Sequence, residues 1–351
     1  MKKFVAVIAV VLMMAFALAA CAPAQAPAAS NAASDSQAPA ASKPADGKKE
    51  VYVWACQYNS LPLFVNNDYI GMDLVAEELG VEVKKIGPQQ IDMPAFIAAI
   101  EQEIPKKPDG MMVVGWEASL ATAIDKAMDA GIPVVTVDAD VPKSKRICFV
   151  GTDWYYLGVN QAKAIAPYLK DKTGKAVLIG IPGADNNVQA LNGYTATLKE
   201  LAPNITVEQQ VYASQSNAQK VAETVGNLLK SDETIVAVGG FDSTTGPGIA
   251  QAIKEANKVG KVFGTCVDAE LEHLQGVKDG ALVAAVGQKR HFFTYYGVKM
   301  LYDYNHSKVR FTTDDAKAGI TPIPAMVSTG FIVATPENVD LMIETAQSKA
   351  K

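Results

Sequence analysis

Residues 110–138 read GMMVVGWEASLATAIDKAMDAGIPVVTVD, in which two apolar runs flank one amphipathic segment. The runs Gly110–Gly115 and Pro133–Val137 are continuous in hydrophobicity, which is typical of strands buried on both faces of a parallel sheet. The segment Leu120–Ala130 between them has a helical pattern. Two parallel strands joined by a helix form a right-handed βαβ unit, so these residues predict an α/β fold.

The same alternation extends along the chain from Val51 onward. Two successive sets of apolar runs alternate with helical patterns, which predicts two similar, doubly wound parallel-sheet lobes. In sheets of this kind the ligand binds at the carboxyl ends of the strands. The expected strands are Val51–Cys56, Val81–Ile86, Gly110–Gly115, Pro133–Val137 and Ile147–Gly151, then Ala176–Ile181, Thr206–Tyr212, Thr234–Gly239, Lys261–Val267 and Leu282–Val286.

The composition narrows the class of protein. The 351 residues carry a formal net charge of -5 and include only three arginines, Arg146, Arg290 and Arg310. Nucleic-acid binding needs clustered basic residues, so we expect no nucleic-acid partner. The cysteines form no CxxC pair and the histidines lie far apart, which argues against a metal site. Because no phosphate-binding glycine loop, GxSxG or HExxH motif is present, we expect neither a cofactor nor an enzyme.

The N-terminal segment is predicted to direct export. Lys2 and Lys3 precede an apolar run, Phe4–Ala20, that ends at Cys21. A basic start, an apolar segment and small residues before a cleavage point are typical of a signal peptide. The run is also close to the length of a membrane-spanning helix, so an uncleaved anchor is the alternative.

The cysteine favours cleavage, because Leu18–Cys21 (LAAC) resembles the lipobox of bacterial lipoproteins. This resemblance implies that residues 1–21 are a lipoprotein signal peptide and that Cys21 carries lipid. Residues 22–49 are rich in Ala, Pro and Ser, which predicts a disordered linker. We therefore expect an extracytoplasmic protein anchored by lipid to the bacterial cell membrane. The remaining cysteines lie in apolar strand-like segments and are expected to be buried thiols: Cys56, Cys148 and Cys266.

Several short segments carry a family signature. Residues 130–138 (AGIPVVTVD) end in an aspartate, residues 150–158 (VGTDWYYLG) contain a GTD motif, and Gly287–Gln288 and residues 328–340 (STGFIVATPENVD) follow in order. Together these segments resemble the type I periplasmic binding proteins, the sugar-binding components of ABC importers such as the ribose-binding protein. Gly87–Pro88 further resembles the branch that contains rhamnose-binding proteins and the autoinducer-2 receptor.

The resemblance implies two lobes joined by a three-strand hinge. The crossings are expected near Thr152–Asp153, Gly287–Lys289 and Ile323–Val327. The N-terminal lobe would then comprise residues 51–152 and 288–323, and the C-terminal lobe residues 153–287 and 324–351.

The resemblance also implies a mechanism and its partners. A small-molecule ligand held by both lobes would favour the closed state, and the closed monomer would deliver the ligand to an ABC permease with its ATPase. A sensor subunit that reports the bound state to a kinase or chemoreceptor is the rival interpretation.

Most of the residues expected to contact the ligand lie just after the carboxyl ends of the predicted strands. Asp138, Asp268 and Gln288 match sugar-contacting positions of the family, and Phe64 matches an aromatic residue that stacks on the sugar. A carboxylate accepts charge-assisted hydrogen bonds from neighbouring hydroxyls, and an aromatic face covers the apolar side of a sugar ring. Of the neighbouring aspartates Asp138 and Asp140, one is expected to contact the ligand and the other to serve as a cap or hinge contact. The full expected set is Phe64, Trp116, Asp138, Asp140, Trp154, Asn186, Phe241, Asp268 and Gln288.

The ligand class remains open between two alternatives. The family commonly places arginines at the position of Ala139 and within residues 186–194, where this chain has none. A buried unpaired carboxylate is costly, so hydroxyls, a Lys or Arg from elsewhere, or a positive ligand must compensate. Family membership favours a sugar, polyol or related carbohydrate, whereas the carboxylates and aromatic rings also suit a cationic or amine-bearing ligand.

Overall fold

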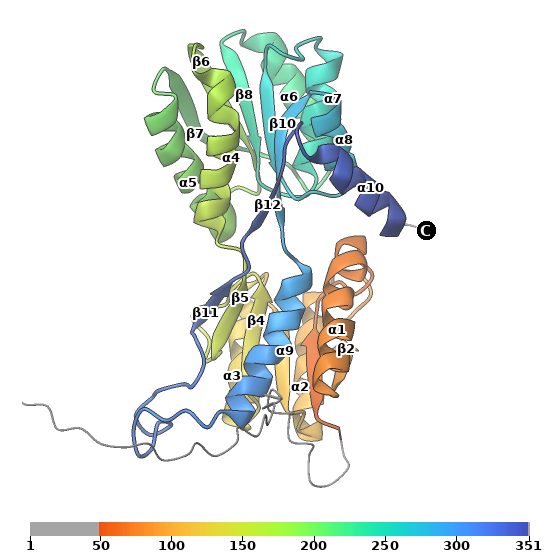
Figure 1. Cartoon of the computed structure of the whole chain (residues 1–351), viewed down its shortest axis with the longest axis vertical. Helices are drawn as coiled ribbons and strands as arrows, with labels where there is room; N and C mark the ends of the chain where they lie inside the picture. The colour runs from red at the N-terminus through yellow and green to blue at the C-terminus, as the bar shows by residue number, and fades with distance from the viewer. Residues whose placement is uncertain (1–48, 350–351) are drawn as a thin grey trace, which may run out of the picture. The chain divides into compact units, whose positions relative to one another are not determined.

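The computed structural model describes residues 49–349, which form two six-stranded sheets with helices on their faces (Figure 1). The predicted α/β fold of two similar lobes is confirmed. The proposed signal peptide, most of the linker and Cys21 lie outside the described residues. Within residues 49–349, no helix has the length and apolar character needed to cross a membrane.

The first sheet is entirely parallel and has the order β11-β5-β4-β3-β1-β2. Every residue of β3 and β4 is buried, which explains why these strands read as continuous apolar runs. The strands are β1 Val51–Ala55, β2 Glu82–Ile86, β3 Gly110–Val114, β4 Val134–Asp138, β5 Cys148–Gly151 and β11 Met326–Ser328.

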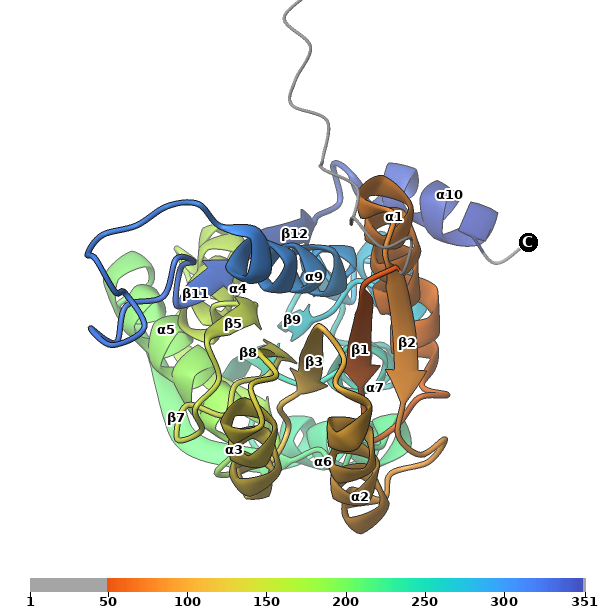
Figure 2. The ribbon, with the colours of Figure 1, turned by 90° about the horizontal axis from the view of Figure 1, so that it is seen from below.

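Two layers of helices cover the first sheet (Figure 2). Helices α1 and α9 bury Trp54, Met72 and Val298 on one face, while α2 and α3 bury Phe96 and Ile124 on the other. The helices are α1 Tyr69–Leu79, α2 Met93–Glu103, α3 Ala121–Asp129 and α9 His291–His306, with short turns at η1 Phe64–Asp68, η2 Ile104–Lys106 and η3 Ala118–Leu120.

The second sheet repeats the same plan with the order β12-β10-β9-β8-β6-β7, and only β12 runs antiparallel to its neighbour. Helices α4 and α5 pack on one face and α6, α7, α8 and α10 on the other. Its strands are β6 Gly174–Gly180, β7 Ile205–Ala213, β8 Ile235–Gly240, β9 Phe263–Val267, β10 Leu282–Gln288 and β12 Phe331–Ala334. Its helices are α4 Trp154–Leu169, α5 Asp185–Leu201, α6 Ala218–Ser231, α7 Thr245–Glu255, α8 Leu271–Lys278 and α10 Val339–Lys349.

The described chain passes between the sheets three times, and one predicted crossing is wrong. Met326–Ser328 pair with β5 in the first sheet, where they satisfy backbone groups that an open edge would expose. Residues 324–328 therefore belong to the first lobe, and the crossing is at Thr329–Gly330 rather than at Ile323–Val327. The turn suits Gly330, whose φ of 75° is the left-handed conformation that glycine adopts readily.

The other two crossings lie close to their predicted places. Trp154 begins α4 in the second lobe directly after β5 ends at Gly151. Gln288 pairs with Phe331 and is the last residue of β10, so the predicted boundary between residues 287 and 288 is one residue early.

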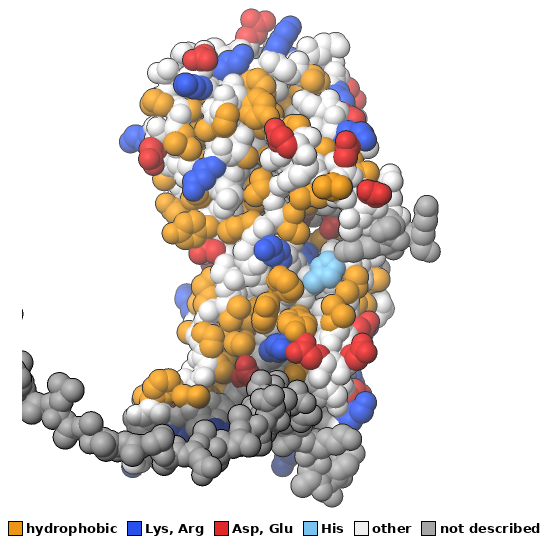
Figure 3. All heavy atoms as spheres, in the orientation of Figure 1, with side chains coloured by type: hydrophobic (Ala, Val, Ile, Leu, Met, Phe, Trp, Pro, Cys, Tyr) orange, Lys and Arg blue, Asp and Glu red, His pale blue; other side chains and the backbone are white. Residues whose placement is uncertain are grey.

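Surface charge is mixed on the face shown in Figure 3, where basic and acidic side chains are interspersed among hydrophobic ones over both lobes.

Candidate ligand-binding site

Two aspartates occupy corresponding positions in the two sheets. Asp138 ends β4 and Asp268 follows β9, and each of these strands is third from the edge in its own sheet. Both residues are buried, and both have left-handed backbones, with φ of 69° and 68°. Such a backbone is strained for an aspartate, and strain of this kind gathers at functional sites. The fold therefore holds one carboxylate of each lobe in a defined orientation.

Both oxygens of Asp138 accept a hydrogen bond from the first lobe. Arg290 Nη1 donates to Oδ1 at 2.7 Å and Trp116 Nε1 donates to Oδ2 at 2.7 Å. Each carboxylate oxygen can accept more than one hydrogen bond, so Asp138 keeps acceptor capacity for ligand hydroxyls. The Trp116 side chain, which is 39% exposed, presents an aromatic surface beside that carboxylate.

Arg290 is the cationic partner of Asp138, which corresponds to the alternative of a Lys or Arg from elsewhere in the chain. Its Nε and Nη2 donate to the two oxygens of Asp68 at 3.0 and 3.2 Å, while its Nη1 holds Asp138. Arg290 is 3% exposed and Asp68 is fully buried. The guanidinium also lies over the rings of Phe64 and Phe293, at 5.1 and 5.0 Å from their centres. Its charge is thus shared between two carboxylates in a site closed to water.

The shared arginine leaves this cluster with more negative than positive charge. Burial raises the pKa of Asp68 to about 7, and Arg290 only partly opposes this shift while Asp138 adds to it. Burial disfavours a charged guanidinium, but the carboxylates of Asp138 and Asp68 outweigh it and hold the pKa of Arg290 above its ordinary value. Arg290 therefore stays charged, and Asp68 is the member of the cluster that takes up a proton near neutral pH.

A one-turn π-helix spans Phe64–Asp68, and its first and last residues both contact Arg290. π-helical turns are rare and often occur at functional sites. Phe64 and Asp68 are both fully buried, and Phe64 contacts Trp54 edge-on and Trp116 at a tilt, with ring centres 5.5 and 5.6 Å apart. Phe64 thus lies beneath Trp116, and Trp116 is the aromatic ring of this pair that reaches solvent.

Asp140 is occupied by structural contacts. Arg146 donates to both of its oxygens, at 2.8 and 2.6 Å, and Thr136 Oγ1 donates to Oδ1 at 2.7 Å. Asp140 therefore has hydrogen-bond partners different from those of Asp138. Of these two aspartates, only Asp138 is hydrogen-bonded to Trp116 within the described residues.

In the second lobe, Asp268 accepts a hydrogen bond from Gln288 Nε2 at 3.1 Å. Within residues 49–349 no lysine, arginine or histidine forms a salt bridge with it. Phe241 is 1% exposed and packs edge-on against Tyr194 in the core, so it underlies the strand ends. Asn186 accepts from the backbone and side-chain nitrogens of Asn187 at the start of α5.

Several buried polar atoms near the strand ends lack a hydrogen-bond partner in the described chain. Gln288 Oε1 and Trp154 Nε1 belong to residues of the expected contact set, whereas Asp242 Oδ2 and both side-chain polar atoms of Gln57 belong to strand-end residues outside that set. Gln57 follows β1 and Asp242 follows β8, so both lie at the strand ends, where ligand contacts are expected. Buried polar groups are normally paired, and a polar ligand would supply the missing partners.

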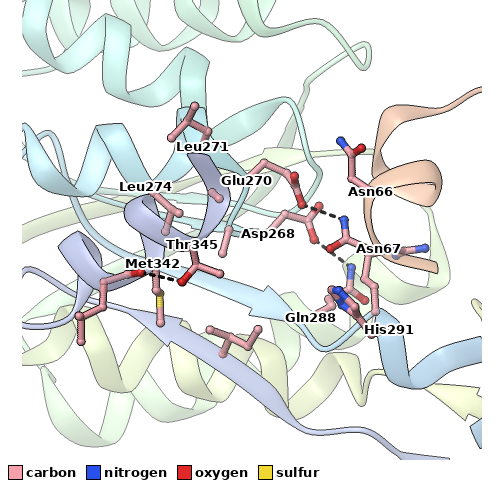
Figure 4. A pocket seen from close by; sticks show the side chains of 15 residues that line it. Asn66, Asn67, Asp268, Glu270, Leu271, Leu274, Gln288, His291, Met342 and Thr345 are labelled. Carbon is pink, nitrogen blue, oxygen red and sulfur yellow. Dashed lines mark hydrogen bonds between the residues drawn. The ribbon is translucent and has the colours of Figure 1, made fainter. Parts of the chain in front are cut away.

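A cavity of about 440 Å³ reaches Asp268 and Gln288 from between the lobes (Figure 4). Asn67 of the first lobe donates to Glu270 of the second through Nδ2 and Oε1 at 3.3 Å, beside this cavity. Burial and the nearby Asp268 raise the pKa of Glu270.

Within residues 49–349 no cluster of His, Cys, Asp and Glu side chains suits a metal ion. The thiols Cys56, Cys148 and Cys266 are free and buried.

Residues 52–308 match the family described as periplasmic binding protein domain. The ribose import binding protein of Bacillus subtilis (strain 168) is 25% identical over 269 residues, which cover 75% of this chain and 84% of that protein. An arabinose-binding protein from Geobacillus stearothermophilus has a similar structure, with a TM-score of 0.74 and 29% identity over 84% of this chain and 99% of that one. A sugar-binding protein of a sugar ABC transporter from Bacillus halodurans gives a TM-score of 0.76 and 26% identity over 83% and 99%.

Proposed function

Because this chain belongs to the periplasmic binding protein family, as a type I sugar-binding member, we propose that it captures a small sugar or polyol between its lobes and delivers it to an ABC permease. The observation that carries this proposal is the pair of buried strand-end carboxylates, Asp138 and Asp268, one from each lobe. A ligand with several hydroxyls can donate hydrogen bonds to both carboxylates at once, which stabilises the closed arrangement of the lobes.

The polar groups around the two carboxylates support a hydroxylated ligand. Gln288 Oε1 and Trp154 Nε1 offer one acceptor and one donor that have no hydrogen-bond partner among residues 49–349. Trp116 would cover the apolar face of a sugar ring while its indole nitrogen keeps Asp138 in place. Such a mixture of acceptors, donors and one aromatic face matches the chemistry of a monosaccharide.

Electrostatics favours a neutral ligand at the first lobe. Arg290 already balances Asp138, so this carboxylate does not require a cation from the ligand. Asp268 forms no salt bridge within residues 49–349, and this observation supports an amine-bearing sugar as the second candidate ligand. The amine would lie at Asp268, and the hydroxyls would lie at Asp138.

The proposed role is ligand binding without turnover, by a monomer outside the cytoplasm. Lipid on Cys21 would anchor the protein, and the linker of residues 22–49 would let the lobes reach the permease. The rival role is that of a sensor subunit. The lobes would close around the ligand in the same way, but the membrane partner would be a kinase or chemoreceptor instead of a permease. Genes for a permease and an ATPase beside this one would support import, and a histidine kinase gene would support sensing.

Calorimetric titration with aldoses, polyols and amino sugars tests the ligand proposal. A neutral sugar should bind with an affinity that is nearly independent of salt, whereas an amine held at Asp268 should bind more weakly as ionic strength rises. Each ligand is incubated with the protein and recovered, and unchanged ligand is expected. Absence of binding by every sugar and polyol, or chemical conversion of one of them, would reject the proposal.

A further inference from the structure

The cavity at Asp268 has two chemically different ends. Its polar end contains Asp268, Gln288 and Glu270, and the opposite end is formed by α8, β12 and α10 of the same lobe (Figure 4). In Figure 4, Leu271, Leu274 and Met342 lie across the cavity from the carboxylates. The apolar residues that line this end are Leu271, Leu274, Ile332, Leu341, Met342 and Ala346.

This apolar end is open to solvent. Leu341 is 70% exposed, Leu271 40% and Ile332 36%, although they surround one hollow. Scattered exposed leucines are ordinary, but apolar side chains grouped around a concavity mark a binding site. The volume of about 440 Å³ is within the usual range for small-molecule pockets.

Closure of the lobes would not cover this wall well. The first lobe faces the cavity with Asn66, Asn67, Arg290 and His291, which are polar or charged. The side-chain amides of Asn66 and Asn67 would lose hydrogen bonds to water if they were pressed against leucine side chains. The wall is therefore matched to an apolar group that arrives with the ligand.

We propose that the wall formed by α8, β12 and α10 is a subsite for an apolar substituent, so that the ligand is a hydroxylated ring bearing an alkyl or aryl group, such as a glycoside. The inference rests on the proposed function, because Asp268 and Gln288 would hold the ring while the substituent extends towards Leu341 and Met342. The continuity of one cavity from the carboxylate to the leucines is the observation that joins the two parts.

Paired glycosides provide the test. Methyl and phenyl glycosides of ribose, arabinose, galactose and glucose, in both anomeric forms, are titrated calorimetrically into the full mature chain. For the ring that binds, the phenyl form should bind at least about tenfold more tightly than the methyl form, which corresponds to about 1.4 kcal/mol. Free sugars are titrated in parallel to measure ring binding alone.

A surface variant locates the substituent. Leu341→Asp should reduce the phenyl preference to less than about threefold and leave methyl glycoside binding unchanged, because charge beside the substituent opposes its burial. Leu74→Asp, at a leucine that is 53% exposed on α1 of the other lobe, is the matched control and should keep the full preference.

The outcomes separate this inference from the proposed function. Equal affinities of methyl and phenyl forms overturn the subsite and leave sugar binding intact. A phenyl preference that survives Leu341→Asp also overturns it, because the substituent then lies elsewhere. Concentration-dependent dimerisation that Leu341→Asp abolishes would assign the wall to a second copy of the chain instead. If no free sugar and no glycoside binds, the proposed function fails and the subsite fails with it.

Discussion

Gln288 and Arg290 lie two residues apart on one crossing segment, yet their side chains bind aspartates of different lobes, Asp268 and Asp138. Gln288 Nε2 donates to Asp268 in the second lobe, and Arg290 Nη1 donates to Asp138 in the first. A rotation of the backbone at Lys289 would therefore change the distance between the two carboxylates. This crossing segment therefore contacts both candidate ligand-binding aspartates directly.

Removal of the buried guanidinium should be strongly destabilising. Arg290→Met keeps much of the volume but leaves Asp68 and Asp138 buried without a cation, which should lower the free energy of unfolding by about 3–5 kcal/mol. Urea denaturation measures the change. The double variant Arg290→Met with Asp68→Asn should recover part of the loss. A single variant within about 1 kcal/mol of the parent would show that the ion cluster contributes little.

Stability should depend on pH through Asp68. Its pKa in the folded chain is about 7, above its ordinary value of 3.8, so the folded state binds a proton that the unfolded state has released between these values. This carboxyl therefore contributes stability that is fully present below about pH 4 and is lost as the pH rises towards 7, by at most about 1.4 kcal/mol per pH unit. Asp68→Asn should remove that decline. Parallel stability curves for parent and variant between pH 4 and 7 would contradict the assignment.

Asp138→Asn should weaken binding of the sugar that gives the largest calorimetric signal with the parent. Loss of a charge-assisted hydrogen bond costs about 1.5–3 kcal/mol, which is about a 10- to 150-fold weaker affinity. Asp129→Asn is the matched control, because Asp129 is on the surface and pairs with exposed Lys145. Equal affinities of the Asp138 variant and the control would remove Asp138 from the binding site.

Anchoring through Cys21 predicts a change of cell fraction. In Cys21→Ala the lipid attachment point is lost, and the protein should leave the membrane fraction and appear in the soluble extracytoplasmic fraction. Fractionation with immunoblotting measures this distribution. Retention of the variant in the membrane, with an unchanged mass, would instead favour an uncleaved N-terminal anchor.

Much of the fold could be predicted because parallel strands are buried on both faces. The apolar runs at β3 and β4 matched their strands to within one residue at each end. The third crossing could not be placed in this way, because Met326 and Ser328 of β11 are exposed and carry no continuous apolar signal. Its position depends on pairing with β5, which is distant in sequence.

The candidate site was less predictable than the fold. Asp138 and Asp268 follow from the strand-end rule, but Arg290 lies 152 positions after Asp138 and 222 positions after Asp68 in the sequence. No local sequence pattern predicts contacts between residues so far apart in the chain. Likewise, only the structure shows that Phe64 and Phe241 are covered by other aromatic rings. The scarcity of arginine was the available signal, because the arginine after the second crossing is one of only three.

The three buried thiols make the described part of this chain suited to site-specific labelling. Burial raises the pKa of Cys56, Cys148 and Cys266, so their thiolates are scarce and shielded from reagents. A cysteine introduced at Tyr156, which is 56% exposed and follows the first crossing, would react with a maleimide dye ahead of them. Fluorescence from that position would report lobe movement directly and turn the protein into a reagentless sensor for its own ligand.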